Sequence, residues 1–62
     1  MYTRYAELRD ALGVNDYKVS KDTGIPASTF SDWKSGRSKP KAEKLMKIAD
    51  YFHKPLEYFL KE

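Results

Sequence analysis

Residues 17–40 read YKVSKDTGIPASTFSDWKSGRSKP, and this stretch decides the fold. Two short helical patterns lie on either side of Gly24, and the second ends at Gly36, before a basic loop that Pro40 closes. Apolar residues recur at helical intervals, at Val19, Ile25, Phe30 and Trp33. Small hydroxyl residues fill outer positions of the second pattern, at Ser28, Thr29 and Ser31. This layout predicts two helices packed at a steep angle, the second of which presents a face of small residues to a groove.

Glycine and proline divide the whole chain into helical segments. Each glycine follows a helical pattern, where a left-handed cap needs no Cβ, and each proline precedes or opens the next pattern, where a missing N–H does no harm. Asn15 is a good N-cap for the second segment. The sequence therefore predicts an all-α, compact five-helix domain without strands, which spans residues 1–62 as one unit. The expected helices cover about residues 3–12, 16–23, 27–35, 41–52 and 55–61.

Apolar stripes along these helices predict the core. The first helix contributes Tyr5, Leu8 and Leu12. The fourth has the broadest apolar face, formed by Ala42, Leu45, Met46, Ile48, Ala49 and Phe52. The fifth would bury Leu56, Phe59 and Leu60. A chain of this length buries only about 60% of its unfolded surface, so the loss of one core side chain, at roughly 2–5 kcal/mol, should matter.

Composition excludes several classes of protein. The chain has no cysteine and one histidine, so we expect neither a disulfide nor a metal site. It has no phosphate-binding glycine loop and no plausible Ser–His–acid set, so we expect no enzyme, no cofactor and no small-molecule substrate. No apolar run approaches the roughly 18 residues that cross a bilayer, and the first residues lack a signal-peptide pattern. The expected location is the cytoplasm, or the nucleus in a eukaryote.

Positive charge is concentrated in one segment. Residues 34–47 contain six basic residues and one acid, which gives +5, whereas the whole chain carries +3. A basic segment on a nearly neutral body indicates a localised anion-binding face. The alternative is an ordinary lysine-rich helix exposed to solvent.

The ordered pattern from Leu8 to Leu60 resembles the lambda-repressor-like helix-turn-helix family, of the Cro/CI or xenobiotic-response-element (XRE) type. The resemblance rests on VSKDTGIPASTFSDWKSGRSKP at 19–40 and KLMKIADYF at 44–52. Its matching positions are Val19, Gly24, Ile25, Ser28, Phe30, Trp33, Gly36, Pro40, Leu45, Ile48 and Ala49. Members of that family are five-helix DNA-binding domains, usually transcriptional repressors of phages and bacteria that often act as dimers. The resemblance therefore implies a regulator that binds a double-stranded DNA operator with paired half-sites as a homodimer.

By position, the resemblance implies that residues 27–35 form the recognition helix. The expected base-facing residues are Ala27, Ser28, Thr29 and Asp32. The expected phosphate contacts are hydroxyl and cationic side chains around them, namely Tyr17, Lys18, Ser31, Lys34, Ser35, Arg37 and Lys39. Asp16 departs from the pattern, because many members have glutamine there and an acid cannot donate to a phosphate. Tyr17 and Lys18 could supply donors instead, and Asp16 could simply help to cap its helix.

Each of these roles has a plainer alternative. Ser28 could cap its helix while Asp32 complements the helix dipole, and Arg37 and Lys39 could be free surface charges. The segment around Tyr58 and Phe59 could form a dimer surface or only seal the core. The alternative function is a protein-binding module, of the antitoxin or adaptor type, that keeps the helix-turn-helix fold.

Overall fold

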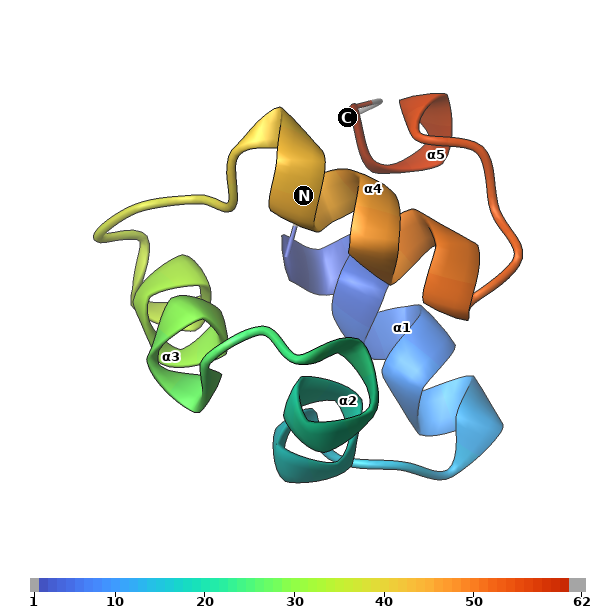
Figure 1. Cartoon of the computed structure of the whole chain (residues 1–62), viewed down its shortest axis with the longest axis horizontal. Helices are drawn as coiled ribbons and strands as arrows, with labels where there is room; N and C mark the ends of the chain where they lie inside the picture. Colours follow the sequence, from blue (N-terminus) through green and yellow to red (C-terminus); the bar gives the residue numbers. More distant parts are fainter. Residues whose placement is uncertain (1, 61–62) are drawn as a thin grey trace.

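A computed structural model describes residues 2–60, and within that range the chain forms five helices and no strand. The helices are α1 (Tyr2–Leu12), α2 (Asp16–Thr23), α3 (Ala27–Ser35), α4 (Ala42–Tyr51) and α5 (Glu57–Leu60). Figure 1 shows α3 at the edge of the molecule, joined to α4 by an extended loop. The all-α, five-helix prediction is confirmed. None of these helices, within the described range, is long and apolar enough to cross a bilayer.

The core gathers residues from all five helices and from the α2–α3 loop. Its buried hydrophobic members are Tyr5, Val19, Ile25, Phe30, Trp33, Leu45, Ile48, Ala49 and Phe59. The ring of Tyr5 lies at the centre, with its centroid 5.2 Å from the ring of Phe30 and 5.2 Å from that of Trp33. Because α1 holds the inner side of α3 in this way, the opposite side of α3 must face outward.

Local capping signals set the ends of α2 and α3, which coincide with the predicted ranges 16–23 and 27–35. The Asn15 side chain accepts a hydrogen bond of 2.9 Å from the Lys18 N–H, so the predicted N-cap is confirmed. Gly24 and Gly36 close the two helices with φ of 78° and 81°, a left-handed conformation that suits glycine.

The fourth helix is shorter than the predicted range 41–52. Lys41 is extended, with ψ of 167°, so α4 begins at Ala42. At the other end, Phe52 is the C-cap and His53 follows with φ of 58°. The Lys54 N–H then donates to the Ala49 carbonyl at 2.9 Å, which completes a helix end of the kind usually built on glycine. Because glycine was expected at such helix ends, this cap was not predicted from the sequence.

The first and fifth helices also differ from their predicted ranges. α1 begins at Tyr2 rather than at residue 3. The expected helix 55–61 is reduced to a single turn, because Pro55 and Leu56 form a turn whose carbonyls accept the N–H groups of Tyr58 and Phe59 at 3.0 Å. The last predicted position, Lys61, lies outside the described residues.

Three large apolar residues assigned to the core are exposed instead, namely Leu12, Met46 and Leu60. Ala42 is exposed as well. Helical periodicity predicts which side of a helix is apolar, but not how much of that side the neighbouring helices cover. Leu12 lies in the last turn of α1 and lines a shallow hollow beside Tyr51 and His53. The core assignment of these four residues was therefore wrong.

Candidate nucleic-acid interface

The packing of α3 determines which of its side chains face solvent. Phe30 and Trp33 are buried, which fixes the inner side of the helix. Ala27, Ser28 and Ser31 are consequently exposed, and Thr29 and Asp32 are partly exposed at the edges of the outer side. The base-facing residues expected from the sequence therefore lie together on the outer side of α3.

The small polar side chains of this outer side are available for new hydrogen bonds. The N-cap of α3 is Pro26, and no side chain caps the helix. Within residues 2–60, the hydroxyls of Ser28, Thr29 and Ser31 have no hydrogen-bond partner. The alternative that Ser28 serves as a helix cap is therefore wrong, and these hydroxyls could donate to or accept from another molecule.

Asp32 is linked to the turn that follows α3. Its backbone carbonyl accepts the Arg37 N–H at 2.9 Å and the Ser35 hydroxyl at 3.1 Å. Its carboxylate lies 4.0 Å from Arg37 Nε, at the limit of an ion pair, and the Arg37 side chain is 79% exposed. Such an exposed pair contributes little to stability. Moving the Arg37 side chain from Asp32 to a phosphate would therefore reduce the stability of the fold only slightly.

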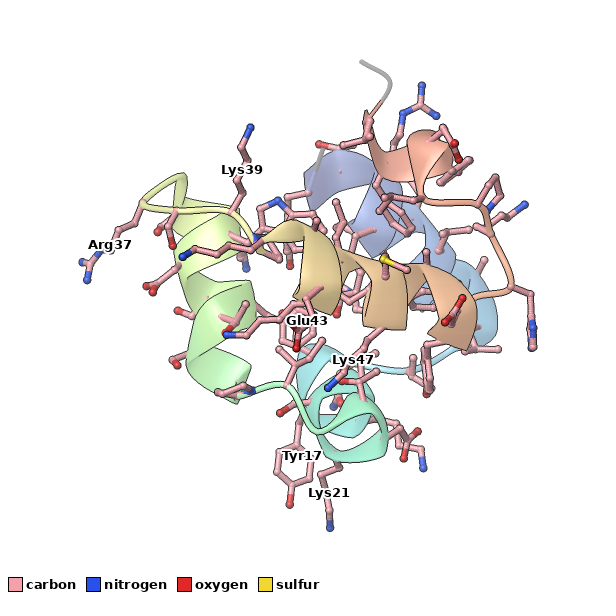
Figure 2. All side chains as sticks on the ribbon, turned by 45° about the horizontal axis from the view of Figure 1, so that its top comes forward. Tyr17, Lys21, Arg37, Lys39, Glu43 and Lys47 are labelled. Atoms are coloured by element: carbon pink, nitrogen blue, oxygen red, sulfur yellow. The ribbon has the colours of Figure 1, made fainter. Side chains whose placement is uncertain are left out.

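The α3–α4 loop presents cations to solvent. Arg37 and Lys39 are exposed, and Figure 2 shows both side chains extending away from the body of the molecule. Pro40, by contrast, is buried and anchors the loop. Lys34, in the last turn of α3, is exposed as well. The structure thus places the expected cations beside the C-terminal end of α3.

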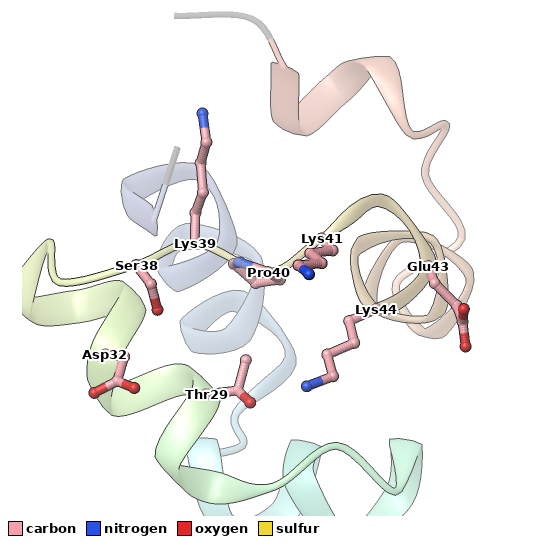
Figure 3. Close-up of a pocket in the computed structure, with 8 residues that line it drawn as sticks. All are labelled: Thr29, Asp32, Ser38, Lys39, Pro40, Lys41, Glu43 and Lys44. Atoms are coloured by element: carbon pink, nitrogen blue, oxygen red, sulfur yellow. The ribbon is translucent and has the colours of Figure 1, made fainter.

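A hollow of about 480 Å³ lies between α3 and the start of α4, and we call it the α3–α4 hollow. Figure 3 shows the residues that line it, which are Thr29, Asp32, Ser38, Lys39, Pro40, Lys41, Glu43 and Lys44. Lys41 and Lys44 were not among the site residues expected from the sequence. In the sequence both belong only to the basic segment 34–47. That Lys44 faces Thr29 depends on tertiary packing, which the sequence pattern did not contain.

The departure at Asp16 has a structural explanation. The Asp16 carboxylate accepts hydrogen bonds from Tyr5 Oη at 2.6 Å, Arg9 Nη1 at 3.0 Å and Tyr2 Oη at 3.3 Å. We call these four residues the α1–α2 network. Burial opposes the ionisation of Asp16, but the hydrogen bonds from Tyr5 and Arg9 outweigh it, so the pKa of Asp16 lies below its usual value. Asp16 therefore joins α2 to α1, and Asn15 rather than Asp16 supplies the side-chain cap.

The expected donors of α2 lie apart from the basic loop. Figure 2 shows Tyr17 extending from α2, at the other end of α3 from Arg37 and Lys39. Tyr17 is 66% exposed, and its ring lies 5.6 Å from Lys21 Nζ. Lys18 forms an ion pair of 3.3 Å with Asp22 on the same helix. Phosphate contacts by Tyr17 and Lys18 therefore belong to a different part of the surface from contacts by the loop.

A comparison with protein families gives one result that bears on this surface. A family model described as helix-turn-helix matches residues 6–59, a range that includes the whole of α2, α3 and α4. No curated protein and no solved structure matches the chain.

Proposed function

The chain belongs to the XRE, or lambda-repressor-like, helix-turn-helix family, and from that premise we propose that it binds a specific double-stranded DNA sequence by placing α3 in the major groove. In this proposal it is a phage or bacterial transcriptional repressor that works in the cytoplasm by binding rather than by catalysis. One observation carries the proposal. The outer side of α3 combines free hydroxyls with a flanking loop of exposed cations.

Base recognition would come from Ala27, Ser28, Thr29 and Asp32. The Ser28 hydroxyl can donate to or accept from a base edge, and the Thr29 methyl can contact a thymine methyl. Asp32 can accept from the N4 amine of cytosine. The outer side of α3 has no Arg, Asn or Gln, so part of the specificity would come from DNA shape and bridging water.

Phosphate binding would come from the side chains around α3. Arg37, Lys39 and Lys34 lie at its C-terminal end, with Ser31 and Ser35 on the helix itself. Tyr17 and Lys18 of α2 would reach the backbone at the other end. Such contacts supply sequence-independent affinity and fix the register of the protein on the duplex.

We further propose that the protein binds as a homodimer on paired half-sites. A domain of 62 residues has little surface to place on DNA. Two copies on half-sites about one helical turn apart, roughly 34 Å, would double that surface. Phe59 is fully buried and seals the core, and Tyr58 is covered by Arg4 and Lys54 at 5.2 and 5.3 Å. A dimer surface around α5 would therefore use its exposed residues, such as Leu60, rather than Phe59.

The test is selection of bound duplexes from random-sequence DNA, followed by titration of the selected duplex at two salt concentrations. The proposal predicts an enriched motif and affinity that falls steeply as salt rises. A scrambled duplex of equal length is the control for specificity. Absent or salt-insensitive binding would contradict the proposal and would favour a protein-binding module of the antitoxin or adaptor type.

A further inference from the structure

The α3–α4 hollow is surrounded by unpaired cations. Within residues 2–60, Lys39, Lys41 and Lys44 have no carboxylate at ion-pair distance. Lys18 of α2, in contrast, is paired with Asp22 at 3.3 Å. The positive charge around the hollow is therefore available to an external anion.

The two carboxylates at the hollow do not occupy its cationic side. Asp32 belongs to the α3 wall, where Arg37 Nε lies 4.0 Å away. Figure 3 shows Glu43 leaving α4 on the side away from Thr29, whereas Lys44 extends toward Thr29. The Thr29 hydroxyl has no partner in the described part of the chain. An ammonium group and a free hydroxyl thus face one another across the hollow.

The start of α4 adds to this preference for anions. Lys41 is its N-cap, and no side chain forms a capping hydrogen bond there. The N–H groups in the first turn of a helix lack intrahelical acceptors, and the helix dipole makes that end electropositive.

We propose that this hollow binds one backbone phosphate of the duplex, with Lys44 as the principal cation and Lys41 and the Thr29 hydroxyl beside it. This inference rests on the function proposed above. The major groove is about 12 Å wide, close to the diameter of a helix with its side chains, so a phosphate backbone must run along each flank of α3. Lys44 extends toward Thr29, in the N-terminal half of α3, whereas Arg37 lies beyond the C-terminal end of that helix and does not line the hollow. A phosphate bound by Lys44 in the hollow would therefore be distinct from one held by Arg37 in the loop.

The first experiment compares Lys44→Gln with Lys47→Gln. Lys47 is a matched control, because it is exposed on the same helix but lines a different hollow, beside Asp22 and Asp50. Fluorescence anisotropy with a labelled, selected duplex gives log K against log salt for each protein. Loss of one phosphate contact should make the slope shallower by about 0.9 for Lys44→Gln. Lys47→Gln should keep the wild-type slope, and all three proteins should melt at the same temperature.

The second experiment locates the phosphate. A series of duplexes carries a neutral methylphosphonate at one position at a time. At one position the methylphosphonate should lower the affinity of the wild type for the duplex but leave the affinity of Lys44→Gln unchanged. The absence of such a position, an unchanged slope for Lys44→Gln, or equal effects of the two glutamine variants would overturn the inference. If the wild type shows salt-dependent binding, these outcomes leave the proposed function standing. Wild-type protein that binds no duplex would overturn both.

Discussion

Replacing Asp16 by asparagine tests the α1–α2 network, because the change keeps the shape of the side chain and removes its charge. The carboxylate accepts from Tyr5 at 2.6 Å and from Arg9 at 3.0 Å. Hydrogen bonds to a charged group contribute about 1.5–3 kcal/mol each. Asparagine retains one acceptor oxygen, and the Arg9 and Asp16 side chains are 20% and 30% exposed. We therefore expect a loss of about 2 kcal/mol at neutral pH, which lowers the Tm by roughly 8–16 °C in so small a domain.

The effect of this substitution should depend on pH. The folded pKa of Asp16 is lowered, so the stability that its carboxylate contributes is complete above the unfolded pKa of about 3.9 and is lost as pH falls through the folded value. Thermal unfolding followed by circular dichroism or by the fluorescence of the single tryptophan measures the difference between wild type and variant. That difference should be largest at neutral pH and should shrink in acid, as pH falls through the lowered pKa of the folded state.

Asp10→Asn is the matched control for Asp16→Asn. Asp10 also forms an ion pair with Arg9 at 3.0 Å, but its side chain is 69% exposed, so its loss should cost less than about 0.5 kcal/mol. Equal losses for the two variants would show that the half-buried Asp16 carboxylate contributes no more to stability than the exposed Asp10 carboxylate. A loss for Asp16→Asn that stays undiminished in acid would contradict a contribution from the ionised carboxylate.

Four further substitutions address the interface and the fold. Lys39→Ala should weaken binding to all duplexes alike and make the salt slope shallower by roughly one, which anisotropy measures; an unchanged slope removes Lys39 from the phosphate contacts. Ser28→Ala should change the ranking of selected duplexes in competition assays while leaving the Tm unchanged, and a lower Tm with the same ranking would contradict a base contact. His53→Gly should raise the free energy of unfolding by about 0.5–1 kcal/mol, because His53 adopts φ of 58°; a lower value in urea unfolding would contradict this. Phe59→Ala should cost about 3–5 kcal/mol, since Phe59 is fully buried, and an unchanged urea midpoint would show that α5 does not seal the core.

Local signals explain why α2 and α3 were predicted with the correct ends. Asn15, Gly24 and Gly36 act through their own backbone geometry and their immediate neighbours, so no knowledge of packing is required. The same kind of reasoning failed at His53, which takes the left-handed conformation without being glycine. A preference for glycine at such positions is strong but not obligatory.

The remaining differences depend on tertiary structure. Periodicity placed Leu12 and Met46 on apolar faces, but how much of a face is covered depends on the neighbouring helices. Asp16 departed from the family pattern without an evident reason, because its hydrogen-bond partners on α1 cannot be identified from spacing along the chain. Lys44 was missed for the same reason, since its position opposite Thr29 arises from how α4 meets α3. The sequence therefore identified the candidate interface on α3 and a basic segment that includes Lys44, but not the position of Lys44 opposite Thr29.

Backbone amide chemical-shift mapping during titration with the selected duplex shows whether the outer side of α3 contacts DNA. Binding through this side should give the largest shifts at Ala27–Ser35 and at residues 36–44, with small shifts in α5. Unchanged amides throughout α3 in a saturated complex, with the shifts gathered instead on α1 and α5, would contradict it.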